Sequence, residues 1–433
     1  MGSTTDVAPG KHVVIVGAGF AGLHCAMTLA RDEDVRVTII DRNNYQQFQP
    51  LLYQVATGSL AAESAAFNLR SIFSRHTNVD VHISEIVSVD PETRSATGRN
   101  GDVYQGDYLI LAAGTEANFF SIPGVAEYAL PLYSLQDAER LRSTLFGLLE
   151  VSDLKAADKS ADVKVSIVVV GAGPTGVETA GAIVDMFNRA PKHLFSNFDL
   201  SKATVTLVNR GKTVLPPFKA ASQDYVARVL SERGVIVRLG TAVKEITQSE
   251  VLFADGSHLP ASLVIWAGGL KAASLAKDVG IAPGRGGRID VNDDLTVPGH
   301  PQVYALGDFA NAKDKHGNYL PQLGSVALQA GRHCARNILA ATRGEPPEPF
   351  AYFDKGILAM VGLDAAIAEI GPRHFPIDGP LAFVAWLGIH AVLLTTVRAK
   401  TETLLEWAWD YIGGTRVSPI LDQQVVLPKR STE

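Results

Sequence analysis

The 433-residue sequence is poor in cysteine and has no cluster of basic side chains. Its two cysteines, Cys25 and Cys334, stand far apart in unrelated contexts, which excludes a CxxC redox pair and a zinc-ligand spacing. Both are predicted to be core thiols, and no metal site is expected. Lysine and arginine are scattered through a chain of net charge -6, which argues against nucleic acid as a partner.

The first residues also lack an apolar run, and position 6 is Asp6. Neither a secretory signal nor a myristoylation pattern is therefore expected, and the protein should face the cytosol. Apolar residues are abundant by contrast, at 46% of the chain. The sequence can bury a large core, divided over two or three domains of roughly 100 to 200 residues each.

A glycine-rich turn follows the first apolar strand. The run HVVIVGAGFAG, His12 to Gly22, has the pattern of a strand, a turn and a helix start, and the next strand ends at Asp41. Strand, GxGxxG, helix, strand and acid, with about 20 residues before the acid, is a strong dinucleotide-binding signal. Gly17 allows the tight turn, Gly19 lets the backbone approach a pyrophosphate, and Gly22 permits close helix packing. The phosphates then lie at the amide end of the helix.

The same pattern recurs in the middle of the chain. Gly171, Gly173 and Gly176 follow the strand KVSIVVV, and the next strand ends at Asn209. Two such units imply two different dinucleotides, which makes sense when one reduces the other. Glu178 lies about one and a half turns into the second helix, where an acid is unusual because the ligand's negative charge normally occupies that helix start.

Three further apolar strands end in glycine, at Tyr108–Glu116, Leu263–Leu270 and Gln302–Ala310. Ligands bind beyond the carboxyl ends of strands in open parallel sheets, so each end is placed to touch a cofactor. The pattern predicts an α/β fold with two Rossmann-like dinucleotide-binding domains and a C-terminal region. The expected division is residues 11–120 and 285–350 for the first domain, 121–284 for the second, and 351–433 for the C-terminal domain.

The C-terminal region carries a long uncharged run. Leu381 to Val397 holds 17 consecutive residues without Asp, Glu, Lys or Arg, at the lower limit for a membrane span of about 17 to 25 residues. The next segment, TETLLEWAWDYI, predicts a helix with an acidic face, an opposite apolar face and two tryptophans at the borders. The acidic face should weaken attraction to anionic lipid. The acidic face holds Glu402, Glu406 and Asp410. The apolar face holds Leu404, Leu405, Ala408, Tyr411 and Ile412, and the borders hold Trp407 and Trp409.

Two interpretations of this region remain open. Amphipathic membrane-attachment helices over about 381–412 fit the pattern, with peripheral attachment to one leaflet because the apolar run is short. The alternative is a pair of helices that cover the core or form a dimer contact.

These segments together resemble the type II NADH:quinone oxidoreductases, single-subunit respiratory dehydrogenases that do not pump protons. The likeness runs from about residue 11 to 425 and includes FQPLLYQVATGSL, VVGAGPTGVETAG, VYALGDFA, FAYFDKGILAMVG and AFVAWLGIHAVLL. Generic flavoprotein reductases share the glycine motifs and the GD strand but not the last two segments. The layout and the ILDQQ ending look most like actinobacterial members.

The resemblance implies non-covalent FAD at the first glycine motif and NADH at the second. Hydride would pass from nicotinamide to flavin, followed by reduction of a membrane quinone, either menaquinone or ubiquinone. Asp41 would bind the FAD ribose, Asp308 the ribityl chain or pyrophosphate, and Lys355 would stabilise the anionic reduced flavin. The expected FAD-binding residues are Gly17, Gly19, Phe20, Ala21, Gly22, Asp41, Arg42, Gln54, Ala113, Gly114, Thr115, Gly307, Asp308, Gly324 and Ser325.

Glu178 and Lys355 are the expected catalytic residues. In the family this glutamate sits where nicotinamide and quinone meet the flavin, so it would position the nicotinamide or relay a proton if burial raises its pKa. The alternative is a simple helix-dipole contact, worth about 0.3 to 1 kcal/mol. The expected nicotinamide-binding residues are Gly171, Gly173, Pro174, Thr175, Gly176, Glu178, Asn209, Arg210, Gly268 and Gly269.

Two positions depart from the family pattern. Asn209 and Arg210 stand where an acid for the NADH ribose is usual, so NADPH is an alternative donor, although Asn209 can hydrogen-bond a ribose hydroxyl. The quinone is expected at Ser325 and Gln329, and Ser325 is shorter than the glutamine of the family motif.

Two other functions compete with quinone reduction. A soluble FAD-dependent reductase of disulfides, sulfide or ferredoxin needs paired cysteines or a basic docking face, and neither is evident. A non-enzymatic nucleotide-binding scaffold has no use for two nucleotide units with an acid between them. We expect a peripheral, monotopic enzyme on the cytoplasmic face of the cell membrane, bound to the bilayer surface, and the family implies a homodimer.

Overall fold

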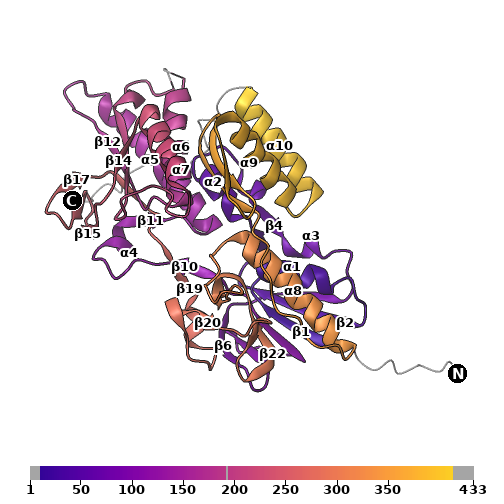
Figure 1. Cartoon of the computed structure of the whole chain (residues 1–433). Coiled ribbons are helices and arrows are strands. Elements are labelled where there is room, and N and C mark those ends of the chain that lie inside the picture. Colours follow the sequence, from indigo (N-terminus) through magenta and orange to yellow (C-terminus); the bar gives the residue numbers. More distant parts are fainter. Residues whose placement is uncertain (1–9, 192–193, 413–433) are drawn as a thin grey trace. The chain divides into compact units, whose positions relative to one another are not determined.

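The computed structural model describes residues 10–191 and 194–412, and the chain divides into two compact units (Figure 1). The first unit comprises Met1–Gln46, Phe67–Glu116 and Leu270–Asp354. The second comprises Gln47–Ala66, Ala117–Gly269 and Lys355–Glu433. Compared with the expected boundaries, residues 270–284 lie in the first unit, while residues 47–66 and the C-terminal region lie in the second. Their assignment as FAD and nicotinamide domains stays a prediction.

The first unit is built on a mostly parallel sheet with strand order β21-β22-β9-β1-β2-β5. The apolar strand β1 (Lys11–Val16) pairs in parallel with β2 (Val35–Asp41) and β9 (Tyr108–Leu111). Both faces of β1 are buried, which explains its unbroken apolar sequence. The other elements are β5 (Val79–Ile83), β6 (Ile86–Asp90), β7 (Ser95–Gly98), β8 (Val103–Gln105), β19 (Leu270–Ala272), β20 (Ile289–Asp290), β21 (Thr296–Val297), β22 (His300–Ala305), β23 (Ala310–Asn311), α1 (Phe20–Leu29), α3 (Leu69–Ile72) and α8 (Gly324–Thr342).

Helices α1 and α8 pack against each other in this unit (Figure 1). Gly331 permits the close approach, because a Cβ at that position would lie 2.1 Å from the Ala21 carbonyl oxygen. Cys25 and Cys334 lie in this helix pair and are fully buried, so the prediction of core thiols is confirmed. Their contexts are not unrelated, however: burial first, and then a hydrogen bond with Cys25, raise the pKa of Cys334.

The second unit contains a parallel sheet in the order β11-β18-β12-β13-β14. Its central strand β12 (Val165–Val170) pairs with β13 (Ala203–Val208) and β18 (Leu263–Trp266), and helix α6 (Pro174–Arg189) follows it. The other elements are α2 (Leu52–Ala56), α4 (Val125–Tyr128), β11 (Ala129–Pro131), α5 (Leu135–Ala156), α7 (Ala220–Arg233), β14 (Val235–Arg238), β15 (Val243–Ile246), β16 (Glu250–Phe253) and β17 (His258–Pro260). Strands β3 (Tyr45–Gln47), β4 (Ala66–Asn68) and β10 (Thr115–Ala117) contain the points where the chain passes from one unit to the other.

An antiparallel sheet and two helices complete the second unit. Strands β24 (Gly356–Gly362), β25 (Ala365–Ile370) and β26 (Phe375–Asp378) pair in that order. Strand β24 packs on α6, where Gly181 makes room because a Cβ would lie 2.0 Å from the Val361 carbonyl oxygen. Figure 1 shows α9 (Gly379–Leu393) and α10 (Val397–Ile412), in orange and yellow, as neighbours.

Helix α9 is 15 residues long, about 22 Å at 1.5 Å per residue, against the roughly 30 Å of a bilayer core. Across the described residues, no helix combines the length and the apolar character that crossing a membrane requires. The ILDQQ ending and the side chains of Tyr411 and Ile412 lie outside the described residues.

The acidic side of α10 faces the protein. Glu406 accepts a hydrogen bond from the Ser64 hydroxyl at 2.9 Å, and Asp410 is buried. On the outer side, Leu405 is 65% exposed and Trp409 is 61% exposed. The expected weakening of attraction to anionic lipid therefore does not apply to these two acids. Trp407 is also not a border residue, because it is buried within the second unit.

Candidate active site

The two glycine turns have the same backbone geometry. The φ angle is +99° at Gly17 and +107° at Gly171, a region that glycine enters without steric cost. A Cβ at Gly17 would lie 2.4 Å from the Ala112 carbonyl oxygen, and one at Gly171 would lie 2.3 Å from that of Ala267. Only glycine can therefore occupy either position without displacing the backbone at Ala112 or Ala267.

The third glycine of each motif allows its helix to pack against the turn. A Cβ at Gly22 would lie 1.9 Å from the Gly17 carbonyl oxygen, and one at Gly176 would lie 1.8 Å from that of Gly171. Each helix start is thereby held directly against the strand that precedes it.

The middle glycines, Gly19 and Gly173, differ from the others. Each is the N-cap of its helix, α1 or α6, and a Cβ added there would meet nothing within 4 Å. Neither helix has a side-chain cap or an acid in its first turn. An open cradle at the positive end of a helix fits a dinucleotide pyrophosphate.

Asp41 is fixed beside the first glycine turn. Its two carboxylate oxygens accept hydrogen bonds from the Ala18 and Asn43 amides, both at 2.8 Å. Burial raises the pKa of Asp41, and these two hydrogen bonds oppose that shift. A carboxylate has further lone pairs, so Asp41 can also accept ribose hydroxyls.

Asp308 lies in a single helical turn after β22, next to Gly307, whose φ is +64°. Burial raises the pKa of Asp308 to about 6, while the positive charge of Arg288 lowers it. In the described part of the first unit, no hydrogen bond reaches this half-buried carboxyl group. Ligand hydroxyls would supply the missing partners.

The expected quinone residues already have partners within the first unit. The Ser325 hydroxyl is hydrogen-bonded to the Tyr352 hydroxyl at 3.0 Å. The Gln329 amide uses both polar atoms on Phe353, donating to its carbonyl oxygen and accepting from its N–H, each at 3.0 Å. A role of these residues in binding quinone stays a prediction.

The remaining expected FAD residues are divided between the units. Phe20, Ala21, Arg42, Ala113, Gly114, Thr115 and Gly324 belong to the first, whereas Gln54 belongs to the second, together with Lys355. No observation tests their predicted contacts with FAD, so these contacts also stay predictions.

In the second unit, the strand β13 leads to Asn209 in place of an acid. The Asn209 Nδ2 group donates to the Thr213 carbonyl oxygen at 2.9 Å, which leaves Oδ1 as its free acceptor side. Arg210 is exposed. The opposite loop holds Gly268 and Gly269, and the Gly269 N–H donates to the Tyr133 hydroxyl at 3.2 Å. Burial raises the pKa of Tyr133 to about 12.

Glu178 points away from its glycine turn. Its Oε1 accepts the Met360 N–H from β24 at 3.1 Å, and the side chain is buried. Burial raises the pKa of Glu178 to about 8, and the Met360 hydrogen bond opposes this. The Trp386 indole N–H also lies close enough to lower that pKa, although its geometry is not that of a normal hydrogen bond. Glu178 is therefore protonated at neutral pH and can act as an acid.

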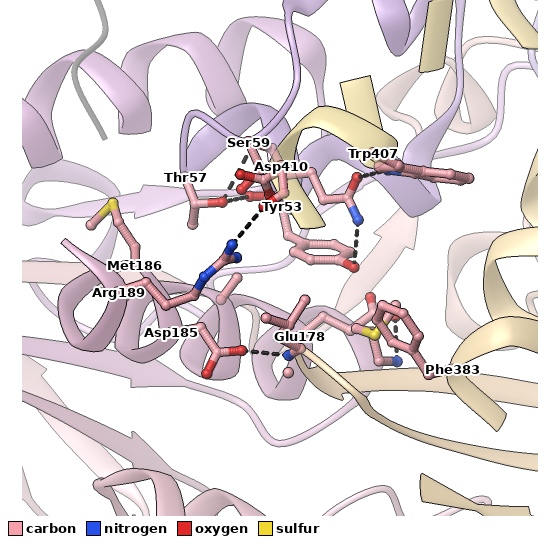
Figure 2. A pocket seen from close by; sticks show the side chains of 15 residues that line it. Tyr53, Thr57, Ser59, Glu178, Asp185, Met186, Arg189, Phe383, Trp407 and Asp410 are labelled. Atoms are coloured by element: carbon pink, nitrogen blue, oxygen red, sulfur yellow. Dashed lines mark hydrogen bonds between the residues drawn. The ribbon is translucent and has the colours of Figure 1, made fainter. Parts of the chain in front are cut away.

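A cavity with both polar and apolar lining lies beside Glu178, within the second unit (Figure 2). Its walls come from α2, α6, β24, α9 and α10. It leaves about 60 Å³ for the centres of water-sized molecules, which is room for a few waters. Besides Glu178, its lining includes the ionisable side chains of Asp185 and Arg189 on α6 and of Asp410 on α10.

Some of these residues could not be found by sequence reasoning. Tyr53 belongs to a segment that contributes only to the family resemblance, and Trp407 is predicted at the border of a helix. Nothing in the neighbouring sequence marks either one as a cavity residue. Asp185 and Arg189 follow Glu178 at helical spacing on α6, which is the one signal that could have indicated a shared face. Among the described residues, no group of three or more His, Cys, Asp or Glu side chains could hold a metal ion.

Comparison with known proteins gives the family. Residues 11–331 match the family described as pyridine nucleotide-disulphide oxidoreductase. The type II NADH:quinone oxidoreductase Ndh of Mycobacterium tuberculosis is 33% identical, over 97% of this chain and 92% of that protein. NdhA of the same organism is 32% identical, over 96% and 91%. The chain belongs to the type II NADH:quinone oxidoreductase family.

A solved structure has the same fold as this chain. NDH2 from Plasmodium falciparum, in complex with NADH, superimposes with a TM-score of 0.83 at 19% identity, over 94% of this chain and 99% of that one. The sequence-based prediction of the family is confirmed, and so is the α/β dinucleotide-binding fold. Membrane anchoring by the C-terminal helices stays a prediction.

Proposed function

We propose that this protein is an FAD-dependent NADH:quinone oxidoreductase that reduces a membrane quinone, menaquinone or ubiquinone, without pumping protons. The observation that carries the proposal is the match to type II NADH:quinone oxidoreductases along nearly the whole chain, at 33% identity. The two open glycine cradles support it, because the reaction needs two dinucleotides on one polypeptide. When bound, FAD supplies the two-electron redox chemistry.

The chain's own groups then have separable tasks. The Gly19 cradle with Asp41 and Asp308 would hold FAD, and the Gly173 cradle with Asn209 would hold NADH. NADH oxidation coupled to quinone reduction takes up one proton, since NADH, one proton and quinone give NAD⁺ and quinol. Glu178, protonated at neutral pH, would deliver a proton to the quinone oxygen. We place Lys355 as a cation that favours the reduced flavin.

NADH is the proposed donor, and the geometry of Asn209 supports that choice. With Nδ2 occupied by the Thr213 carbonyl oxygen, Oδ1 can only accept, as a carboxylate would, and a ribose 2'-hydroxyl can donate to it. A 2'-phosphate has no proton to offer there. The exposed Arg210 is the one feature that favours NADPH, which stays the alternative donor.

Peripheral attachment to the cytoplasmic face of the cell membrane is the proposed location. Helix α9 exposes Leu381, Val384 and Val392, and α10 exposes Leu405 and Trp409. With Glu406 and Asp410 turned inward, the outer surface of α10 is largely apolar, as an interfacial helix requires. A homodimer, implied by the family resemblance, stays a prediction.

A bleaching experiment tests the proposed function. The purified protein should be yellow, lose its colour with NADH under anaerobic conditions, and regain it when a soluble quinone is added. A reduced flavin that no quinone reoxidises would contradict quinone reduction and favour a different acceptor.

A vesicle experiment tests the proposed location. Leu405→Ser with Trp409→Ser should lose co-flotation with lipid vesicles while FAD content is kept. Val103→Ser, at an exposed apolar position of the first unit, is the matched control and should float as wild type does. Undiminished flotation of the double variant would remove α10 from the attachment surface.

A further inference from the structure

A chain of buried hydrogen bonds connects α10 to α2 within the second unit. The indole N–H of Trp407, which can only donate, is 2.8 Å from the Oε1 atom of Gln54. This contact fixes the orientation of the Gln54 amide, so Nε2 must face the other way. Nε2 donates to the Tyr53 hydroxyl oxygen at 3.0 Å. All three side chains are buried.

The direction of this chain determines what the Tyr53 hydroxyl can do. Because its oxygen accepts from Gln54, the hydroxyl proton must point elsewhere. Tyr53 and Glu178 line the same cavity, and Figure 2 shows the phenol ring extending from α2 toward the Glu178 end. The ring packs edge-on against Trp386 at 6.3 Å between centroids, which fixes its position. Tyr53 is therefore held as a hydrogen-bond donor in a space that admits water.

The charged groups of the cavity are less suited to pass a proton to Glu178. The two carboxylate oxygens of Asp185 accept from the Arg233 guanidinium and from the Leu363 N–H. Arg189 donates to the Asp410 carbonyl oxygen. Burial raises the pKa of Asp185, and its contacts with Leu363 and Arg233 oppose that shift while engaging both of its carboxylate oxygens.

On α9, His390 stacks on Trp386 at 3.9 Å between ring centroids. Burial lowers the pKa of His390 to about 4, so its imidazole is uncharged at neutral pH, and its Nδ1 atom is engaged with the Trp386 carbonyl oxygen at 2.7 Å. The cavity lining contributed by β24 and the residue after it consists of Met360, Gly362 and Leu363, which do not titrate. Compared with Asp185, Arg189 and His390, the Tyr53 hydroxyl is thus better placed to exchange protons between water and Glu178.

We propose that Tyr53 is a proton-relay residue for Glu178, held in its donating orientation by Gln54 and Trp407. The inference rests on the proposed function. After Glu178 gives its proton to the quinone oxygen, the carboxylate takes a proton from the Tyr53 hydroxyl, directly or through a cavity water. The Tyr53 oxygen takes a proton from the next water in the same step. Only O–H bonds form and break, and one solvent proton reaches the quinol.

Comparison of two electron acceptors tests the relay. Tyr53→Phe keeps the ring and removes the hydroxyl group. It should bind FAD and be bleached by NADH at the wild-type rate, while reoxidation of the flavin by a soluble quinone slows at least about tenfold. Reoxidation by ferricyanide, which accepts electrons without protons, should stay within about twofold of wild type. The slowed reoxidation by quinone should show a larger solvent deuterium isotope effect than the wild-type reaction, because proton transfer then limits its rate.

Two further variants keep the result interpretable. Trp407→Phe removes the indole donor but keeps an aromatic ring, and should slow quinone reoxidation several-fold in the same selective way. Tyr128→Phe, at an exposed tyrosine of the same unit, is the matched control and should behave as wild type.

The outcomes separate this inference from the proposed function. Quinone reoxidation at the wild-type rate in Tyr53→Phe would overturn the relay, and so would an equal loss with quinone and ferricyanide, which indicates a structural role. If Tyr53→Phe does not fold, an unselective or absent effect of Trp407→Phe would overturn it. A wild-type enzyme that reduces no quinone would instead overturn the proposed function.

Discussion

The two glycine motifs share one backbone and differ in the side chains around it. The turn amides of Gly17 and Gly171 donate to the ends of their neighbouring strands at the same distance, 2.7 Å. The first motif is followed by a helix whose buried residues are apolar, and its second strand ends in a tethered carboxylate, Asp41. The second has a buried acid, Glu178, in its helix and an amide, Asn209, at the strand end.

This difference shows that the residues that form the cradles are distinct from the side chains that could take part in a reaction. Steric contacts around three glycines are sufficient to build a pyrophosphate cradle, so both motifs have one. What the bound nucleotide does depends on the side chains next to the cradle, and of the two helices that follow the described glycine turns, α6 contributes Glu178, Asp185 and Arg189 to a cavity. Under the proposed function, the first motif would retain a cofactor, whereas the second would exchange a substrate and move a proton.

The largest expected effect comes from filling each cradle separately. Gly19→Val should abolish FAD binding, and Gly173→Val should keep the yellow colour but weaken reduction by NADH at least about 100-fold, because each side chain occupies the phosphate position. Both variants should keep the wild-type Tm of the cofactor-free protein, since neither Cβ meets an atom within 4 Å. Flavin absorbance and anaerobic NADH titration measure the effect. Equal loss of FAD in both variants would show that the two cradles are not independent.

The next effect concerns the buried acid of α6. A folded-state pKa near 8, above the usual 4.5 of glutamate, means that the folded protein binds more protons than the unfolded chain between these values. The stability contributed by the protonated Glu178 is thus present below about pH 4.5 and is lost as the pH rises toward 8.

Glu178→Gln should remove this dependence. The variant should gain stability relative to wild type between pH 5 and 8, by on the order of 2 to 4 kcal/mol at the upper end. It should also retain FAD and turn over quinone more slowly. Thermal unfolding across this pH range measures the first effect, with Glu150→Gln on the exposed side of α5 as the control. A constant difference in Tm from pH 5 to 9 would contradict the raised pKa, and unchanged turnover would remove Glu178 from the mechanism.

A smaller effect is expected where the strand ends differ. Asn209→Asp gives the second motif the carboxylate of the first and should raise the ratio of kcat/KM for NADH over NADPH by about tenfold, because it repels a 2'-phosphate. The change should appear in KM and leave kcat with NADH nearly constant. A ratio that does not move would show that Asn209 does not contact the ribose, and a strong NADPH preference of the wild type would overturn the choice of donor.

The glycine turns could be predicted from sequence because the strand, the turn, the helix and the second strand follow one another within a unit of about 30 residues. The cavity could not, since Trp407 and Gln54 are separated by 353 positions and nothing local indicates their contact. Periodicity did separate the two faces of α10, but it could not say which face is buried. Hydrophobic patterning favours the apolar face inside, and the hydrogen bond between Glu406 and Ser64 shows the reverse arrangement.

Helix α10 exposes Leu405 and Trp409 and turns the carboxylates of Glu406 and Asp410 inward, opposite to the arrangement of an ordinary surface helix. In a buffer without lipid or detergent, these exposed apolar side chains can pack against any other apolar surface, including the same surface on a second copy of the protein. A molecular mass measured in plain buffer would then include copies joined through these exposed side chains, and comparison with the mass in detergent or nanodiscs separates such copies from the native assembly.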